Sequence, residues 1–136
     1  MRVFFLTCLV LPLAAQNHTL TLTVQGFKSD QGEAAIAVHK DASTFPMKAE
    51  KAVASQRVPI KDGVVTLAFP KLAPGVYAVA VFHDVNGNKK LDTNFLGIPK
   101  EPTGASRDPR PRMGPPKFSD ASFELQSDLA IRITLQ

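Results

Sequence analysis

The sequence has little of what would cross-link the chain or anchor it in a bilayer. Cys8 is the only cysteine among the 136 residues, so no disulfide forms within the chain and a hydrophobic core must hold the fold. Residues 3–11 are nearly all apolar, but a membrane-spanning helix takes roughly 20 such residues. We therefore expect no transmembrane segment in the mature protein.

The first 15 residues instead have the pattern of a signal peptide. Arg2 gives a basic start, an apolar stretch follows, and the segment ends in small residues. We expect cleavage after Ala15 and export to the periplasm or the cell exterior. The mature chain, residues 16–136, is then expected to form one domain, because domains most often run to roughly 100–150 residues. A buried first strand is the alternative for residues 1–15.

The charge of the chain is weakly basic and scattered. The formal net charge is +4 at pH 7, and the one small group of basic residues is Arg107, Arg110 and Arg112. Nucleic-acid binding needs basic residues concentrated on one face of a recognition fold, so we expect no nucleic-acid partner. A solvated loop explains the three arginines most simply, and contact with an acidic glycan or a membrane surface is the alternative.

Alternation of apolar and polar residues predicts β-strands along most of the mature chain. The period of two is clearest at residues 20–27 and 129–135. Further strands are expected at residues 34–39, 58–60, 64–69, 76–82 and 122–125. About seven short strands and no helix long enough for a crossover predict an all-β fold. We expect an antiparallel sandwich of the immunoglobulin-like or transthyretin-like kind.

Turn residues indicate how neighbouring strands connect. Residues 20–27 and 34–39 are expected to pair as a hairpin across a polar turn. The dipeptide Asp62-Gly63 favours the left-handed backbone of a tight turn between two later strands. Residues 47–54 are rich in helix formers and predict a short helix or turn.

The strand at residues 76–82 is apolar on both faces, so both faces must be covered. In a sandwich the second sheet covers one face. A long proline-rich loop at residues 94–119 is available to cover the other, and loops of that length are usually functional or disordered. Its larger apolar residues are Phe95, Leu96, Ile98, Met113 and Phe118. We therefore expect at least the two ends of this loop to pack on the sheet.

A cluster of oxygen-bearing side chains follows this strand. Asp84, Asn86, Asn88 and Asp92 stand at positions one, three, five and nine of a loop. Calcium takes six to eight oxygen ligands, and this spacing lets one turning segment aim several side chains at one point. These four residues are therefore the candidate ligands of a Ca²⁺ site.

The same loop departs from the helix–loop–helix calcium hand. Lys89 replaces the glycine at position six, and Phe95 replaces the glutamate at position twelve. The alternative to a metal site is a tight turn in which the aspartate and asparagine side chains accept backbone N–H groups and Gly87 eases the reversal of the chain.

The sequence contains no recognisable catalytic machinery. The mature chain lacks cysteine, a serine in a Gly-x-Ser-x-Gly turn and a phosphate-binding glycine loop after a strand. His83 neighbours the acidic loop but is alone, which favours a structural histidine at a strand end. We expect a protein that is not an enzyme, with a hydrolase as the alternative if polar groups converge in a cleft.

Three motifs resemble a known family: Leu-Ala-Pro-Gly-Val-Tyr-Ala-Val-Ala-Val-Phe-His-Asp-Val-Asn-Gly-Asn at residues 72–88, Leu-Asp-Thr-Asn-Phe-Leu-Gly-Ile-Pro-Lys-Glu at residues 91–101, and Gly-Pro-Pro-Lys-Phe at residues 114–118. Together they resemble the exported bacterial family known as domain of unknown function 2141. The resemblance implies a secreted or periplasmic β-sandwich and brings no established activity.

A more remote similarity concerns the Pro-Gly-x-Tyr strand and the Asp-x-Asn-x-Asn loop after it. This arrangement is similar to calcium-loaded sandwich repeats of bacterial surface proteins and to transthyretin-type accessory domains. The similarity implies Asp84, Asn86, Asn88 and Asp92 as ligands, although Lys89 stands where those loops commonly have glycine.

The sequence thus predicts an exported, non-enzymatic binding module of the cell envelope, with an envelope glycan or protein as its partner. The loop at residues 84–92 and the proline-rich loop would form one end of the sandwich and present its site. The alternative is a carrier of a small apolar ligand, with a pocket beneath the long loop lined by Phe95, Phe118 and Tyr77.

Overall fold

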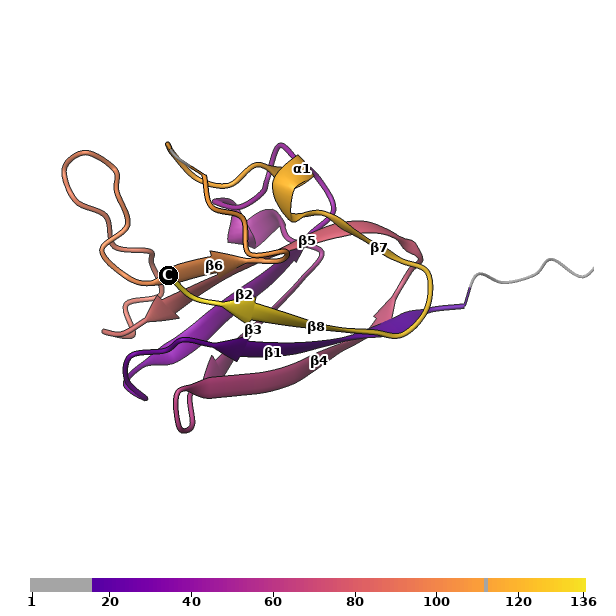
Figure 1. The fold of residues 1–136 in the computed structure, drawn as a ribbon, viewed down its shortest axis with the longest axis horizontal. Coiled ribbons are helices and arrows are strands. Elements are labelled where there is room, and N and C mark those ends of the chain that lie inside the picture. Colours follow the sequence, from indigo (N-terminus) through magenta and orange to yellow (C-terminus); the bar gives the residue numbers. More distant parts are fainter. Residues whose placement is uncertain (1–15, 112) are drawn as a thin grey trace, which may run out of the picture.

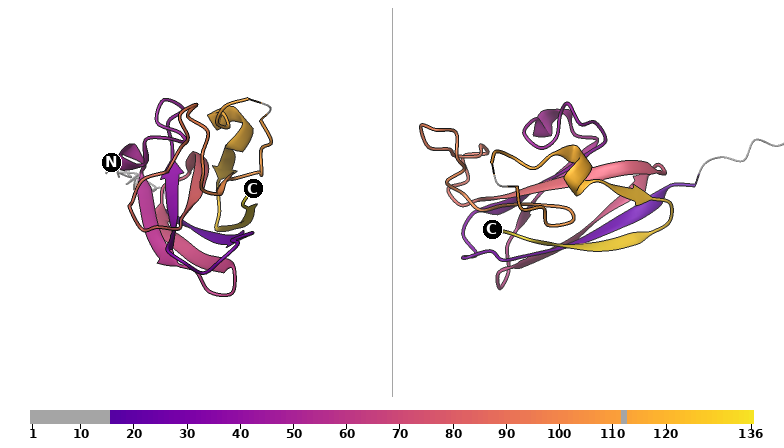
Figure 2. Two further views of the ribbon diagram at one scale, coloured as in Figure 1. Left: turned by 90° about the vertical axis from the view of Figure 1, so that its left-hand side faces the viewer. Right: turned by 45° about the horizontal axis from the view of Figure 1, so that its top comes forward.

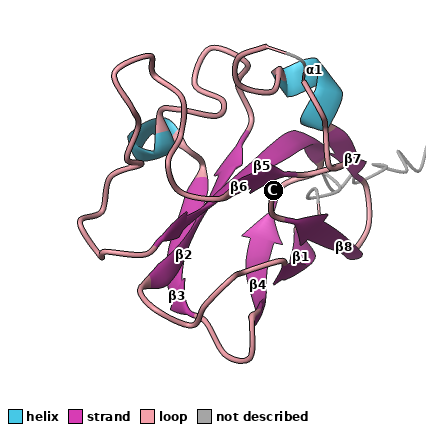
Figure 3. Cartoon of the chain, turned by 60° about the vertical axis from the view of Figure 1, so that its left-hand side comes forward, coloured by secondary structure: helices cyan, strands magenta, loops and turns pink. Residues whose placement is uncertain are grey.

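A computed structural model describes residues 16–111 and 113–136, and the predicted signal peptide lies outside them. In this part of the chain, eight strands form two sheets that face each other (Figures 1 and 3). The strands are β1 (His18–Gln25), β2 (Glu33–His39), β3 (Ala54–Pro59), β4 (Val64–Leu72), β5 (Gly75–Asp84), β6 (Thr103–Ala105), β7 (Phe123–Leu125) and β8 (Leu129–Thr134). The two short helices are the 3₁₀ turn η1 (Ala49–Lys51) and α1 (Phe118–Ala121). The predicted all-β sandwich is confirmed.

Both helices are far shorter than a membrane span. Among the described residues, no helix has the length and apolar character needed to cross a bilayer. The turn η1 lies within residues 47–54, where the composition predicted a short helix or turn.

The smaller sheet has the order β4–β1–β8, and the larger has the order β3–β2–β5–β6, with β7 pairing the first residues of β5. Most pairs are antiparallel, as predicted, but β1 and β8 run parallel, with Leu20 opposite Leu129. The predicted hairpin between the first two strands is wrong, because β1 and β2 lie in different sheets. The reason is burial: β1 alternates between buried and half-buried residues, whereas nearly every residue of β2 is buried and needs cover on both faces.

The Asp62-Gly63 turn is confirmed, but the strands that it joins separate. Both residues have left-handed backbone, with φ of 54° and 72°. Only Lys61 and Val64 pair across the turn before β3 and β4 enter different sheets. The carboxylate of Asp30 accepts the N–H groups of Asp62 and Gly63 at 2.9 and 2.8 Å, so it ties the two connections between the sheets together at this end of the sandwich.

The central strand β5 is covered on both faces, as its sequence predicted. Tyr77, Val79 and Val81 point into the main core between the sheets. Ala78 packs on the opposite face in a second, smaller cluster. Phe45, Ala105 and Ala121 complete this cluster, and Phe118 packs against it.

The proline-rich segment supplies much of this cover, but it is not one continuous loop. Its middle forms the edge strand β6, and its end forms α1. Gly104 of β6 faces the main core, where a Cβ atom would lie 3.0 Å from side-chain atoms of Ile133 and Leu135. The expectation that the ends of the segment pack on the sheet holds for Phe118, which is half-buried. It is wrong for Phe95, which is 95% exposed.

Ser106 joins β5 to the short helix α1 from a fully buried position. Its Oγ accepts the N–H of Val79 at 2.9 Å and donates to the carbonyl of Ala121. The N–H of Ser106 donates to the carbonyl of Val79 at 3.0 Å. Since β7 pairs with residues 75–77 of β5 and β6 pairs with residues 80–82, these bonds fill the gap between the two pairings.

We expect Ser106→Ala to lower the free energy of unfolding by about 1–3 kcal/mol, because it leaves the N–H of Val79 and the carbonyl of Ala121 without this buried partner. Urea denaturation followed by circular dichroism measures the difference. The exposed Ser127 offers a control, since Ser127→Ala should change stability by less than about 0.5 kcal/mol. Equal midpoints for the two variants would contradict the role of Ser106.

Candidate functional site

An extended segment leaves the sandwich between β5 and β6, and we call residues 85–102 the arm. It starts directly after Asp84 and returns to the sheet at Thr103. Figures 1 and 2 show that it projects beyond the end of the two sheets. The predicted calcium loop forms the first part of the arm, so the site has to be judged from how the arm is held.

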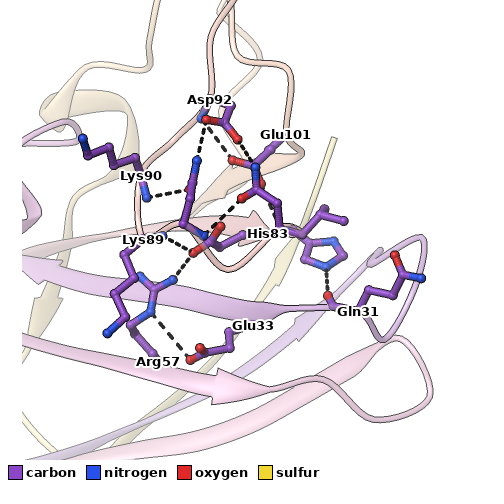
Figure 4. A network of polar contacts seen from close by, with 12 residues as sticks. Gln31, Glu33, Arg57, His83, Lys89, Lys90, Asp92 and Glu101 are labelled. Atoms are coloured by element: carbon purple, nitrogen blue, oxygen red, sulfur yellow. Dashed lines mark hydrogen bonds and ion pairs between the residues drawn. The ribbon is translucent and has the colours of Figure 1, made fainter.

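Glu101 fastens the two sides of the arm at its base. Its side chain is only 8% exposed. Its Oε2 accepts the N–H of Val85 at 2.8 Å, and its Oε1 accepts the N–H of Asp92 at 3.0 Å (Figure 4). A carboxylate that accepts two backbone N–H groups forms charge-assisted bonds, which are stronger than neutral ones. Glu101 therefore closes the first part of the arm into a ring.

Asp84 anchors the start of the arm to the sheet from a fully buried position. Its Oδ2 accepts the backbone N–H of Lys89 at 2.8 Å and bonds the guanidinium of Arg57. The register of the sheet explains why Arg57 reaches Asp84. Glu33 of β2 lies opposite Asp84 of β5, and Ala35, two residues further along β2, lies opposite Arg57 of β3. Residues two apart in a strand share a face.

Arg57 lies between two carboxylates on this face. Its Nε is 3.6 Å from Oε2 of Glu33, and its Nη2 bonds Asp84. The second oxygen of Asp84, Oδ1, is buried and has no hydrogen-bond partner among the described residues. Two carboxylates thus share one cation.

Asp92 gathers the two asparagines of the predicted calcium loop. Its carboxylate accepts the Nδ2 groups of Asn86 and Asn88 at 2.7 and 2.8 Å. The Oδ1 atoms of the same asparagines accept the N–H groups of Asn88 and Lys90 at 3.2 and 2.9 Å. Both amides are therefore bonded at each end, which is the tight turn braced by side chains that the sequence left open as the alternative.

Three of the four predicted ligands thus lie together, and the fourth does not join them by a hydrogen bond. Asn86, Asn88 and Asp92 form one cluster, whereas Asp84 bonds Arg57 and Lys89. Within residues 16–111 and 113–136, no three histidine, cysteine, aspartate or glutamate side chains lie close enough to hold a metal ion.

We expect the hydrogen bonds from the two asparagines to be measurable through the pKa of Asp92. The amides of Asn88 and then Asn86 hold the pKa of the Asp92 carboxyl below its ordinary value of 3.8. A carboxyl group whose pKa is lowered by folding stabilises the folded state at pH values above its ordinary pKa. That stabilisation is lost as the pH falls through the folded-state pKa. In an NMR titration of the side-chain carboxyl carbons, Asn88→Ala should raise the pKa of Asp92 toward 3.8.

Asp41 serves as the internal reference of this titration. A hydrogen bond from the N–H of Ser43 lowers the pKa of Asp41, and this contact lies outside the arm. The titration midpoint of Asp41 should be the same in the parent protein and in Asn88→Ala. An Asp92 midpoint that Asn88→Ala leaves in place would show that the amide does not hold the carboxylate.

The far end of the arm is a turn that carries exposed apolar side chains, and we call residues 94–98 the tip. Phe95, Leu96 and Ile98 are 95%, 68% and 54% exposed. Oδ1 of Asn94 accepts the N–H groups of Leu96 and Ile98 at 2.9 and 3.0 Å. Gly97 has left-handed backbone with φ of 78°, and its N–H donates to the carbonyl of Asn94 at 2.9 Å. The tip is thus a defined turn that aims away from the sheet.

A model of a family described as uncharacterised proteins conserved in bacteria (DUF2141) matches residues 22–132. The chain belongs to this family. The match spans β1 to β8 and includes the whole arm. Neither the curated proteins nor the solved structures contain a match to the chain. The family membership therefore confirms the resemblance that the three motifs carried.

In this family member, His83 points away from the acidic cluster. It is 1% exposed, its ring packs edge-on against Phe27 at 5.2 Å between centroids, and its Nε2 lies 2.6 Å from the carbonyl oxygen of Gln31. Its neighbour Asp84 lies on the other face of β5, because successive side chains of a strand point to opposite faces. The structural histidine that the sequence favoured is the one observed.

The pocket predicted for a small apolar ligand is not formed by the residues named for it. Tyr77 lies in the main core, and its hydroxyl donates to the carbonyl of Ala73 at 2.6 Å. Phe118 covers the opposite face of the larger sheet, and Phe95 lies at the exposed tip. The three residues do not share a pocket, because alternation along β5 sends Tyr77 to the face opposite Phe118 and Phe95 lies on the arm.

Sequence reasoning missed the residues that hold the arm. Glu33 and Arg57 fell in or beside predicted strands, and Glu101 fell in the proline-rich loop. One signal pointed to a cation such as Arg57, because Asp84 follows the strand predicted to be covered on both faces and a buried carboxylate needs a partner. Nothing in the sequence pointed to Glu101, whose role depends on the return path of the arm.

Proposed function

We propose that the protein is an exported, non-enzymatic binding module of the cell envelope, in which the arm is the binding element. The observation that carries the proposal is the contrast within the arm. Its base is fixed by buried carboxylates, Asp84 and Glu101, while its tip exposes the large apolar side chains of Phe95 and Leu96. Exposed apolar groups on a rigid support are typical of interaction sites.

The placement of the polar groups supports a binding role rather than catalysis. Glu101 and Asp84 accept backbone N–H groups, Asp92 accepts the side-chain amides of two asparagines, and the buried His83 packs against Phe27. General acid–base chemistry needs a group within reach of a substrate proton. The signal-peptide pattern of residues 1–15 supports export, and sequencing the amino terminus of the secreted protein should give Gln16 as the first residue.

A shortened arm tests the binding role. Replacing residues 93–99 by a two-residue Asn-Gly turn keeps the ring closed by Glu101, because Asp92 and Lys100 already pair through the bond from Lys100 N–H to the Asp92 carbonyl at 2.8 Å. We expect the parent protein to sediment with bacterial envelope fractions and the shortened protein to remain in the supernatant, with the same thermal midpoint. Equal sedimentation of the parent and the shortened protein would show that the arm is not the binding element.

Calcium binding at the start of the arm is a second candidate function. The observation in its favour is the buried Oδ1 of Asp84, which lacks a hydrogen-bond partner among the described residues. Calcium binds carboxylate and amide oxygens, and Asn86, Asn88 and Asp92 would complete the donor set with Asp84 if the two amides turned their oxygens inward.

Calorimetry and thermal unfolding decide between a metal site and a turn braced by side chains. Calcium should release or absorb heat and should raise the unfolding temperature relative to a chelator, since a ligand at 100 times its Kd stabilises by about 2.7 kcal/mol. Asp92→Asn should abolish both effects, and magnesium serves as the comparison ion. If calcium produced no heat with the parent protein, the calcium site would be ruled out.

A further inference from the structure

The arm carries basic side chains around an uncharged end. Residues 93–99 contain no ionisable side chain. Lys89, Lys90 and Lys100 flank them, and all three are exposed. Figure 4 shows the side chain of Lys90 leading away from the carboxylates of Asp92 and Glu101. An apolar end with exposed lysines on the chain before and after it fits the interface of a membrane with anionic headgroups.

The backbone of the tip is prepared for an environment without water. Four of the five N–H groups of the tip donate within it, those of Asn94, Leu96, Gly97 and Ile98 but not that of Phe95, and Pro99 has no N–H. Unpaired N–H groups are costly in a hydrocarbon environment. A loop that bonds its own N–H groups therefore enters the interface at a lower cost than an open loop.

The shape and size of the tip also favour a bilayer over a protein surface. Stable protein interfaces bury roughly 800 Å² on each partner over some 20–30 residues. Here Phe95, Leu96 and Ile98 lie on one projecting turn, and Val85 is the one other large apolar side chain exposed on the arm. A lipid surface needs no complementary shape, so a few apolar side chains and adjacent lysines suffice.

We propose that the tip inserts into the headgroup region of an anionic phospholipid bilayer, with Phe95, Leu96 and Ile98 entering the interface and Lys89, Lys90 and Lys100 contacting lipid phosphates. This proposal rests on the proposed function, in which the arm is the binding element, and it names the partner. The arm then positions the sandwich at the membrane surface without a spanning segment.

A single tryptophan reports insertion directly, because the sequence contains none. In Phe95→Trp, vesicles of phosphatidylglycerol and phosphatidylcholine should shift the emission to shorter wavelength. Val53→Trp is the matched control, since Val53 is 52% exposed but lies between η1 and β3. Its emission should not change. The same spectrum for Phe95→Trp with and without vesicles overturns the proposal.

Vesicle sedimentation measures the contribution of each group. Phe95→Ser should lower the partition coefficient about tenfold, and Lys90→Gln should lower it about fivefold. Both effects require anionic lipid, so binding to phosphatidylcholine alone should be weak, and added salt should weaken binding to the mixed vesicles. Equal binding to neutral and anionic vesicles, or binding that Phe95→Ser leaves intact, overturns the proposal.

The envelope and vesicle experiments separate the two proposals. If the protein sediments with envelope fractions through its arm but not with vesicles, the arm remains the binding element, and a protein or glycan replaces lipid as its partner. If it sediments with neither, both proposals fail.

Discussion

Gly32→Ala is expected to lower the free energy of unfolding by about 4 kcal/mol or more, which is a large part of the total stability of an ordinary domain. Gly32 precedes β2 with φ of 68°, and its Cα lies against the backbone at which the arm begins. A Cβ atom there would overlap the carbonyl oxygen of Asp84 and lie 2.7 Å from that of Val85. Backbone atoms within the sheet cannot move aside as a side chain would.

Gly87→Ala is the matched control for this prediction. Gly87 has the same φ of 68°, but a Cβ atom added there meets nothing within 4 Å. It should cost only the strain of left-handed backbone, about 1–2 kcal/mol. Thermal unfolding of both variants compares the two costs at equal backbone strain. If the two alanines lower the midpoint equally, close packing of Gly32 against the arm is not what the fold requires.

Asp84→Ala is expected to lower the free energy of unfolding by about 3 kcal/mol, because it leaves the guanidinium of Arg57 and the N–H of Lys89 without their shared acceptor. It should also release the first part of the arm, so limited trypsin digestion should cut faster after Lys89 and Lys90. The exposed Asp120 supplies the control, since Asp120→Ala should change stability by less than about 0.5 kcal/mol.

A double-mutant cycle isolates the ion pair within that loss. Arg57→Ala removes the other partner, and the double variant should be more stable than the sum of the two single losses predicts, by about 1–2 kcal/mol. Arg57 is 30% exposed, so solvent screening keeps this coupling below that of a fully buried pair. Strict additivity would show that Asp84 acts only through Lys89.

Local chemistry explains the predictions that succeeded. The Asp62-Gly63 turn follows from the two residues that adopt positive φ, and the double burial of β5 follows from its own apolar run. The predicted hairpin between β1 and β2 failed because the choice of partner depends on which sheet needs a doubly buried strand. That information is spread over the whole chain.

In the candidate site, too, local sequence predicted the local features and missed the contacts that depend on the whole fold. Its position after β5 and its bracing by Asp92 follow from the spacing of aspartates and asparagines. The contact between Arg57 and Asp84 depends on the register of three strands, which no short motif encodes. The apolar content of the tip was visible in the sequence, but its direction is set by Asn94 and the turn that it braces.

The parallel pairing of β1 with β8 makes the smaller sheet depend on the order in which the chain emerges. β1 lies in the middle of this sheet, and one of its edges stays open until residues 129–134 arrive. A chain delivered from its amino terminus therefore cannot complete this sheet before residues 129–134 are available to pair with β1. The architecture delays closure of the smaller sheet until β8 has emerged, after all the strands of the larger sheet.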